Sequence, residues 1–268
     1  AVRDLEREMG IDIFIRNPKG ITLTKDGVEF LSYARQVVEQ TNLLEERYKS
    51  HTETRELFSV SSQHYAFVVN AFVSLLKWAD MTRYELFLRE TRTYEIIEDV
   101  KNFRSEIGVL FLNSYNRDVL TKMFDDNRLT YTSLFKAKPH IFVSKSNPLA
   151  KHKVVSLEDL EDFPYLSYDQ GIHNSFYYSE EILSQIPHKK SIVVSDRATL
   201  FNLLIGLDGY TIATGILNSN LNGDNIVSIP LDIDDDIDIV YLKHKKATLS
   251  KMGEKFLDNL VKEVTFDN

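Results

Sequence analysis

The chain has 268 residues, of which 43% are hydrophobic, so it is long enough for more than one hydrophobic core. It contains no cysteine, which excludes disulfides and cysteine-based metal or thiol chemistry. Its net charge of −8 argues against a general nucleic-acid binder. Residues 1–55 carry 9 Lys+Arg against 10 Asp+Glu, or −1, and the remainder carries 23 against 30, or −7. Any affinity for DNA phosphates must therefore come from the local placement of basic side chains.

The beginning of the chain is charged and amphipathic, which differs from the apolar core of an export signal. No apolar run approaches the roughly 20 residues that a membrane-spanning helix requires. We therefore expect a soluble, cytoplasmic protein that has no membrane partner.

The front of the chain predicts a short helix followed by a β-hairpin. Val2, Leu5 and Met9 recur at helical spacing between charged residues, and Gly10 is suited to end the helix. Apolar and polar residues then alternate on both sides of an Asn-Pro-Lys-Gly turn, which is typical of a hairpin. Thr24 is a good N-cap for a following helix.

Basic side chains gather around that turn. Arg16, Lys19 and Lys25 lie in a stretch that has no acidic residue from 17 to 25, so the hairpin tip is suited to a phosphate backbone. Three cations on a turn are also common on an ordinary solvated surface. Charge alone does not separate the two interpretations.

The next helix has an apolar stripe of its own. From Phe30 the stripe positions are spaced 4, 3, 4, 3 and 4 residues apart, which is the seam of a short coiled coil with one polar member. The seam residues are Phe30, Ala34, Val37, Thr41, Leu44 and Tyr48. The spacing favours a seam that pairs two chains, although a helix packed on its own domain would carry a similar stripe.

After residue 56 the sequence alternates strands with helices. Predicted strands cover 57–60, 84–89, 107–112, 165–168, 191–194, 210–213 and 237–242, with a further apolar segment at 226–231. Predicted helices cover 67–78, 90–100, 176–184, 196–204 and 249–264, and Asp196 is expected to cap the fourth. Such alternation indicates β-α-β units and a mostly parallel sheet.

The segment LEREMGIDIFIRNPKGITLTKDGVEFLSYARQVV at 5–38 resembles the LysR-type transcriptional regulators. In that family a winged helix-turn-helix ends in a pattern close to L-E-x-x-L-G-x-x-L-F-x-R, followed by a wing, L-T-x-x-G and a long linker helix. Eight positions match in register: Leu5, Glu6, Gly10, Phe14, Arg16, Leu23, Thr24 and Gly27. Met9 and Ile13 replace two leucines of the pattern, and both conserve its packing. Residues 146–168 and 194–214 are similar to the second lobe of the family's effector domain.

The resemblance implies a mixed fold: a partial winged helix-turn-helix, a long linker helix, and a periplasmic-binding-protein-like α/β effector domain of two Rossmann-like lobes. The parts would be a DNA-binding domain at 1–27, a dimerisation helix at 28–52, lobe I at 53–137 and 231–268, and lobe II at 138–230. Crossovers would fall near 135–139 and 229–234. The family pattern places further helices, including the base-reading part, before Ala1. The DNA-contacting residues expected in this sequence are Arg3, Arg16, Lys19, Thr24 and Lys25.

In such sheets a ligand lies beyond the carboxyl ends of the strands, where helix N-termini present free N–H groups. Polar residues follow predicted strands of both lobes, so a cleft between the lobes is expected to bind a small molecule. The predicted effector-binding residues are Ser61, Ser62, Thr91, Thr93, His140, Ser167, Tyr168 and Phe176. Taken singly, a Ser or Thr at such a place is more often a helix cap. The positive helix ends mildly favour an acidic effector.

No motif indicates catalysis, a cofactor or a metal. The glycine-rich, nucleophile-elbow and paired-histidine patterns of common enzymes are absent, and the seven histidines are scattered. Arg92, Arg117 and His140 are candidate anion partners, although each is more often a surface or packing residue. The acidic run at 232–238 lacks the glycine and closing glutamate of a calcium-binding loop. We expect no enzyme, no cofactor and no metal site.

The sequence therefore predicts a transcription regulator that binds double-stranded promoter DNA as a dimer or tetramer and responds to a small-molecule effector. The alternative is a stand-alone solute-binding protein of the periplasmic type, which would need an export signal and would have no use for a wing and a heptad helix. A hydrolase or transferase on the same two-lobed fold lacks a nucleophile signature.

Overall fold

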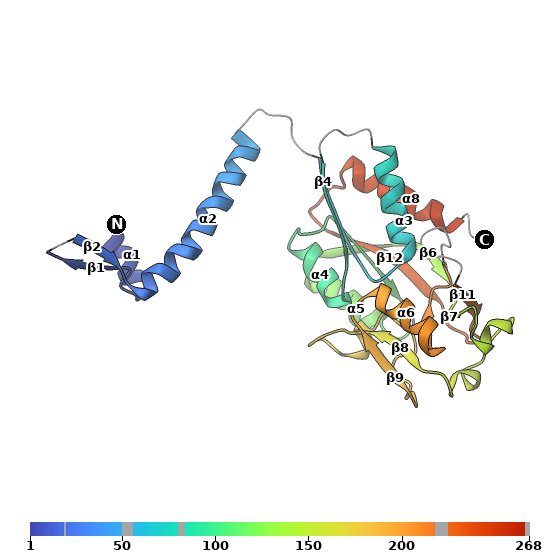
Figure 1. Cartoon of the computed structure of the whole chain (residues 1–268). Coiled ribbons are helices and arrows are strands. Elements are labelled where there is room, and N and C mark those ends of the chain that lie inside the picture. The colour runs from blue at the N-terminus through green and yellow to red at the C-terminus, as the bar shows by residue number, and fades with distance from the viewer. Residues whose placement is uncertain (19, 50–55, 80–83, 218–224, 266–268) are drawn as a thin grey trace. The chain divides into compact units, whose positions relative to one another are not determined.

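The computed structural model describes residues 1–18, 20–49, 56–79, 84–217 and 225–265 (Figure 1). The chain divides into two compact units, residues 1–55 and 56–268, which we call the front unit and the rear unit. Within the described residues, no helix has both the length and the apolar character to cross a membrane.

The front unit contains a helix, a hairpin and a long helix, as predicted. The elements are α1 (Val2–Met9), β1 (Phe14–Asn17), β2 (Gly20–Leu23) and α2 (Lys25–Lys49). The two strands pair antiparallel from Phe14↔Leu23 to Asn17↔Gly20. The predicted helix end is confirmed, because Gly10 has a φ of 68°, a left-handed conformation that glycine adopts without steric cost.

Thr24 fixes the junction between the hairpin and α2. Its hydroxyl oxygen accepts the backbone N–H of Gly27 at 2.7 Å, which confirms the predicted N-cap. Gly27 is buried against the hairpin, and a Cβ at this position would lie 2.1 Å from the carbonyl oxygen of Ile13. Glycine is therefore required where α2 passes the strand end.

The rear unit contains two five-stranded sheets, which define two lobes. Lobe I has the strand order β4-β3-β5-β12-β6, and lobe II has the order β11-β7-β10-β8-β9. The elements of lobe I are β3 (Glu56–Ser62), α3 (Ala66–Trp78), β4 (Tyr84–Glu90), α4 (Thr93–Lys101), β5 (Ile107–Leu112), α5 (Arg117–Asp126), β6 (Leu129–Ala137), β12 (Ile237–His244) and α8 (Lys251–Thr265). Those of lobe II are β7 (His140–Ser144), η1 (Pro148–Lys151), η2 (Glu158–Leu160), β8 (Tyr165–Tyr168), η3 (Phe176–Tyr178), β9 (Ser191–Val194), α6 (Arg197–Leu207), β10 (Tyr210–Ala213) and β11 (Ile226–Pro230).

The chain crosses between the lobes twice, after β6 and after β11. The backbone N–H of Leu231 donates to the carbonyl oxygen of Pro139 at 3.0 Å, so the two crossovers lie side by side. Lobe II is therefore one continuous segment, whereas lobe I is completed by β12 and α8 from the end of the chain.

The prediction of a mostly parallel sheet is wrong. In each sheet two of the strand pairs are parallel and two are antiparallel. The crossovers explain the difference in lobe I, because β6 leaves towards lobe II while β12 returns from it, and neighbouring strands with opposite courses pair antiparallel.

The predicted helix at 176–184 is also wrong. Only Phe176–Tyr178 forms a 3₁₀ turn, η3. Leu183 has a φ of 59°, which a right-handed helix does not permit. The side chains of Glu180 and Glu181 instead accept hydrogen bonds from groups elsewhere in the fold.

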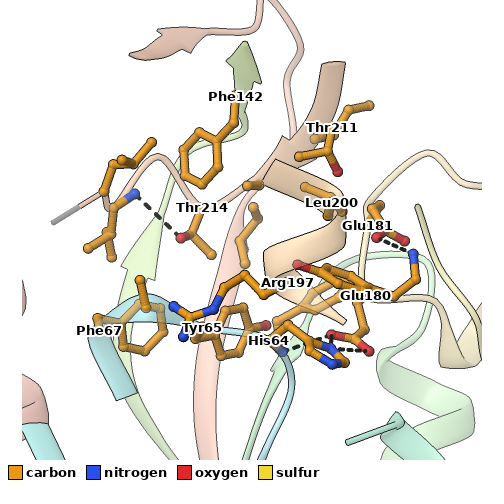
Figure 2. A pocket seen from close by; sticks show the side chains of 18 of the residues that line it. His64, Tyr65, Phe67, Phe142, Glu180, Glu181, Arg197, Leu200, Thr211 and Thr214 are labelled. Atoms are coloured by element: carbon orange, nitrogen blue, oxygen red, sulfur yellow. Dashed lines mark hydrogen bonds and ion pairs between the residues drawn. The ribbon is translucent and has the colours of Figure 1, made fainter. Parts of the chain in front are cut away.

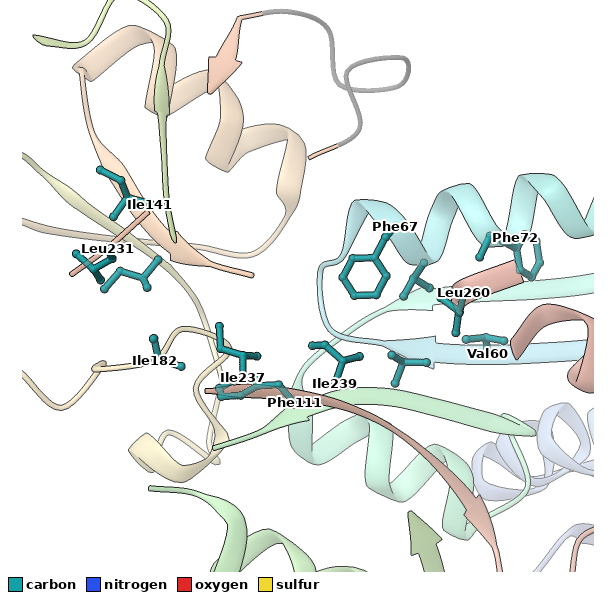
Figure 3. Close-up of a cluster of buried hydrophobic side chains, with 14 of the residues drawn as sticks. Val60, Phe67, Phe72, Phe111, Ile141, Ile182, Leu231, Ile237, Ile239 and Leu260 are labelled. Carbon is teal, nitrogen blue, oxygen red and sulfur yellow. The ribbon is translucent and has the colours of Figure 1, made fainter. Parts of the chain in front are cut away.

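Strand β5 places apolar side chains on both faces of the lobe I sheet. Val109 and Phe111 belong to the cluster formed with α3 and α8, while Leu110 and Leu112 belong to the cluster formed with α4 and α5. The first cluster continues past Ile237 into lobe II (Figure 3). The two lobes thus share apolar packing at the crossovers.

Candidate functional site: the cleft between the lobes

A cavity of about 50 Å³ lies between the lobes. Lobe I contributes the loop after β3 and the start of α3, and lobe II contributes the start of α6 and strand β10 (Figure 2). Its apolar lining includes Phe67, Phe111, Phe142, Leu200, Phe201 and Ile212. Its polar lining includes His64, Tyr65, Tyr168, Glu180, Glu181 and Arg197.

His64 joins the two lobes at the cavity wall. Its backbone N–H donates to Oε2 of Glu180 at 2.9 Å, and its Nδ1 lies 2.9 Å from the same oxygen. The imidazole ring stacks on Tyr168 of lobe II, with ring centroids 4.1 Å apart. The side chains of His64 and Glu180 are 5% and 3% exposed, so solvent does not screen this contact as it would a surface pair.

A hydrogen-bond network continues from Glu180 into lobe I. Gln170 donates to Oε1 of Glu180 at 3.1 Å and accepts the backbone N–H of Thr93, at the start of α4, at 3.2 Å. The Thr93 hydroxyl accepts a hydrogen bond from Gln63 at 2.6 Å, and Gln63 accepts one from the Tyr65 hydroxyl at 2.6 Å. The network therefore couples the helix start in lobe I to the cavity wall in lobe II.

Two ion pairs also cross between the lobes. Arg197, at the start of α6, lies 3.2 Å from Oε1 of Glu90, and Arg92 lies 2.6 Å from Oδ2 of Asp169. The Arg197 pair is the less exposed, at 19% and 24%, against 37% and 42% for the Arg92 pair. Exposed pairs of the second kind contribute about 0–1 kcal/mol to stability.

Glu181 is the second buried carboxyl group of the cavity. It is 3% exposed, and its Oε1 accepts the backbone N–H of Tyr168 at 2.9 Å. Its Oε2 has no hydrogen-bond partner among the described residues. Burial, and next the charge of Glu180, raise the pKa of Glu181 well above its ordinary value of 4.5.

The pKa values of His64 and Glu90 are also shifted. Burial lowers the pKa of His64, but the hydrogen bond and charge of Glu180 and the charge of Glu90 outweigh it, so the pKa is raised above 6.5. Burial raises the pKa of Glu90, partly offset by Arg197 and His64. Both shifts favour the protonated form, which for His64 strengthens the contact with Glu180.

Four of the predicted effector-binding residues lie on lobe I, and none of these four lines the cavity. Ser61 is fully buried, and its hydroxyl lies 2.6 Å from Asp99 and 2.7 Å from Ser105. The hydroxyl of Ser62 is buried without a partner among the described residues. Thr91 donates to Glu95, and Thr93 belongs to the network described above.

The other four lie on lobe II. His140 has its Nδ1 2.8 Å from the carbonyl oxygen of Lys138, Ser167 lies within β8, and Phe176 is 51% exposed. Tyr168 lines the cavity. It is the one member of the eight predicted residues, all of them described, that does so.

Sequence reasoning did not single out Gln170, Glu180, Glu181 or Arg197. The polar pair at 180–181 between aromatic and aliphatic residues is a signal that could have found part of the site. Their partners lie far away in the sequence: Glu180 and His64 are 116 residues apart. No local pattern predicts such a pairing.

The predicted DNA-contacting residues lie on the front unit. Arg3 and Lys25 are exposed, Thr24 is the helix cap, and Lys19 lies outside the described residues. Arg16 lies 3.5 Å from Oε2 of Glu6 and keeps 39% of its side chain exposed. Part of its charge is therefore balanced within the unit.

The predicted seam follows one side of α2. Val37 and Leu44 are 66% and 58% exposed, and the Thr41 hydroxyl donates to the carbonyl oxygen of Val37 at 2.9 Å. Phe30 and Ala34 are half-buried near the hairpin end. The side chain of Tyr48 lies outside the described residues. Self-association of the seam is not tested by this arrangement and stays a prediction.

The acidic residues near β12 form ion pairs and a hydrogen bond with other side chains of the protein. Asp238 lies 2.9 Å from Arg117, and Asp236 lies 2.6 Å from Lys138. Asp235 accepts a hydrogen bond from Asn113 at 3.0 Å. Across the described ranges, no group of three or more histidine or acidic side chains is placed to hold a metal ion.

The comparisons with known proteins agree on one family. The family described as LysR substrate binding domain matches residues 81–265, more than half of the chain. The chain is 27% identical over 177 residues to the transcriptional dual regulator GltC of Bacillus subtilis (strain 168), covering 63% of this chain and 54% of GltC. It is 25% identical over 183 residues to YvbU of the same organism, named an uncharacterized HTH-type transcriptional regulator, covering 66% of this chain and 57% of YvbU. The matched segments span a little over half the length of these curated relatives.

A solved structure shows the same fold. The chain matches OxyR of Corynebacterium glutamicum, solved as a mutant with H2O2 bound, with a TM-score of 0.56 and 14% identity, covering 99% of this chain and 82% of that one. The two mixed sheets fit the periplasmic-binding-protein-like fold predicted from the sequence. The chain therefore belongs to the LysR-type family of transcriptional regulators, through the substrate-binding domain that fills most of its length.

Proposed function

We propose that this chain is a cytoplasmic transcription regulator whose front unit contacts promoter DNA and whose rear unit binds a small-molecule effector between its lobes. The observation that carries the proposal is the buried contact of His64 with Glu180 at the wall of the cavity. A ligand in this cavity touches both lobes, so its affinity depends on how the lobes are arranged. Only a ligand with such a differential affinity can shift a conformational equilibrium.

The crossovers are the proposed hinges. They join the lobes at 138–139 and 231–236, and the bond from Leu231 to Pro139 keeps them together. A rotation about this pair changes the distances of His64 to Glu180 and of Arg197 to Glu90. A coupling free energy of about 1–3 kcal/mol between effector and DNA is enough for a usable switch.

The front unit supports the DNA-binding and assembly parts of the proposal. Arg3, Arg16 and Lys25 give it exposed cations, and the stripe along α2 offers an apolar surface to a second copy, in a dimer or a tetramer. We assign residues 1–27 to DNA contact and 28–52 to dimerisation. The relatives named as transcriptional regulators favour this function over a stand-alone solute-binding protein. We assign no catalytic step to the cleft.

The test is recovery of the DNA sites bound by the complete protein, followed by mobility-shift assays with compounds suggested by the neighbouring genes. In the variant Tyr168→Ala we expect basal DNA binding to survive and the effector response to be lost. Phe176→Ala is the matched control, because this aromatic side chain is exposed and does not line the cavity. An unchanged effector response in Tyr168→Ala would place the effector site elsewhere. Absence of any specific DNA site would overturn the proposed function itself.

A further inference from the structure

Glu181 presents an unused hydrogen-bond acceptor in the wall of the cavity. The residue is 3% exposed and lines the cavity, and its Oε1 accepts the backbone N–H of Tyr168. Its Oε2 is buried and has no partner among the described residues. A buried polar atom without a partner is costly, so such an atom in a cavity wall is a place for a ligand donor.

The charges around Glu181 argue against an anionic ligand. His64 and Arg197 are the basic side chains among the described residues that line the cavity, and each already faces a carboxylate, Glu180 and Glu90 respectively. An incoming carboxylate would meet the charge of Glu180 at this end of the cavity and would have to displace an existing partner of His64 or Arg197. A donor group meets no such competition.

The rest of the cavity determines the body of the ligand. Phe67, Phe142 and Leu200 lie around it in Figure 2, and Phe111 and Ile212 extend the apolar lining. Apolar surface buried against such a lining stabilises a bound ligand by about 25 cal/mol per Å² in general. The site thus combines one polar end with an apolar remainder.

We propose that the effector of this cavity is a small molecule with an apolar body and a primary ammonium group, and that Glu181 receives this group; the inference rests on the proposed function of the cavity as the effector site. The ammonium group donates to Oε2. The O–H bond of the Glu181 carboxyl group breaks, its proton passes to the buffer, and a carboxylate–ammonium pair remains. Burial and the charge of Glu180 raise the pKa of Glu181, which favours the protonated carboxyl group in the empty cavity.

Three probes of similar size separate the ligand classes: 2-phenylethylamine, 2-phenylethanol and phenylacetate. Calorimetry on the full chain, in two buffers that differ in ionisation enthalpy, should show the amine binding at least about tenfold more tightly than the other two, as expected for a charge-assisted hydrogen bond. The amine should release a proton, and the alcohol should not. Tighter binding of phenylacetate, binding of none of the probes, or amine binding without proton release would overturn the inference.

Glu181→Gln is the decisive variant, since the amide keeps the shape and the acceptor for Tyr168 but cannot form the ion pair. The amine should lose its advantage over the alcohol in this variant. Glu254→Gln, an exposed carboxyl group on α8, is the matched control and should bind like the original protein. Retention of the amine preference in Glu181→Gln would also overturn the inference, and amine binding in the original protein tests it even if the variant folds poorly.

The outcomes separate this inference from the proposed function. Phenylacetate that binds in the cavity and changes DNA occupancy would overturn the ligand class and leave the regulatory role intact. Amine binding as expected, without any change in DNA occupancy, would support the ligand class and contradict the coupling between the cavity and DNA.

Discussion

The front unit and the rear unit use apolar side chains in opposite ways. Among the described residues of the front unit, Ile13 and Gly27 are buried, whereas Val37 and Leu44 are more than half exposed. In the rear unit, side chains such as Phe256 are fully buried in continuous clusters. The rear unit is therefore held together by its own core, while the front unit keeps apolar surface that is suited to a partner.

The largest effect is expected from breaking the rear core. Phe256 is fully buried and packs against the rings of Phe58 and Phe72, so Phe256→Ala should lower the free energy of unfolding by about 3–5 kcal/mol. Ile172→Ala is the control, because Ile172 is 92% exposed and its loss should change stability by less than about 0.5 kcal/mol. Denaturant titration measures both. Equal effects in the two variants would contradict the division between core and surface.

The second effect concerns assembly rather than internal stability. Val37→Lys combined with Leu44→Lys should weaken the proposed dimer by about 3 kcal/mol, since each apolar side chain buried at an interface contributes about 1.5–3 kcal/mol. Sedimentation velocity over a range of concentrations measures the assembly. Glu39→Lys, exposed on the same helix but outside the seam, is the control. Assembly that resists the double substitution would show that α2 is not the interface.

The third effect concerns how the stability of the rear unit depends on pH. Because the pKa of Glu181 is raised in the folded protein, its folded form keeps the proton that the unfolded chain loses above about pH 4.5. Stability therefore falls as the pH rises from there towards the folded pKa, by up to about 1.4 kcal/mol per pH unit. Glu181→Gln removes this loss, and we expect the variant to gain stability relative to the original protein as the pH rises towards neutral.

His64 contributes to the same measurement in the original protein and in the variant. Its raised pKa adds stability that is full below its ordinary value of 6.5 and is lost as the pH rises through the folded value. The difference in the free energy of unfolding between the original protein and Glu181→Gln, measured at each pH, isolates the contribution of Glu181. A difference that does not grow between acid and neutral pH would show that Glu181 is not a proton-holding group.

The smallest effect is expected at the hairpin. Arg16→Ala in the complete protein should weaken binding to all DNA sequences by about 1 kcal/mol and reduce the salt slope by about one unit. The effect is limited because Glu6 already lies 3.5 Å from the guanidinium group. Arg35→Ala, on the exposed surface of α2, is the control. A changed base preference with an unchanged salt slope would contradict a phosphate contact.

Local features of the fold were predictable because neighbouring residues determine them. Gly10, Thr24 and Asp196 each end or cap a helix through contacts within a few residues, and the structure confirms all three. The hairpin register follows from alternation on both sides of a turn. Such signals depend on backbone geometry and are visible in a short stretch of sequence.

The candidate site was predictable only as a location. Polar residues after the strands predicted a binding site between the lobes, which stays a prediction. Of the eight residues named, Tyr168 lines the cavity, whereas the hydroxyls of Ser61 and Thr93 bond to other side chains of the protein. The buried carboxyl groups of the cavity wall, Glu180 and Glu181, lie in a segment that was predicted to be helical. Their environment depends on the contact between Glu180 and His64 and on burial between the lobes. Neither of these can be predicted from a short stretch of sequence.

The return of β12 to lobe I has a consequence for how the protein is made. Strand β12 lies between β5 and β6, yet the whole of lobe II is translated before it. At roughly 5–20 residues per second, the ribosome leaves the neighbouring edges of β5 and β6 unpaired for on the order of 5–20 s. Lobe II can fold in that interval, whereas the open strand edges invite pairing with other nascent chains. A stop codon before Ile237 should therefore yield an aggregating product that depends on chaperones, even though every residue of lobe II is present.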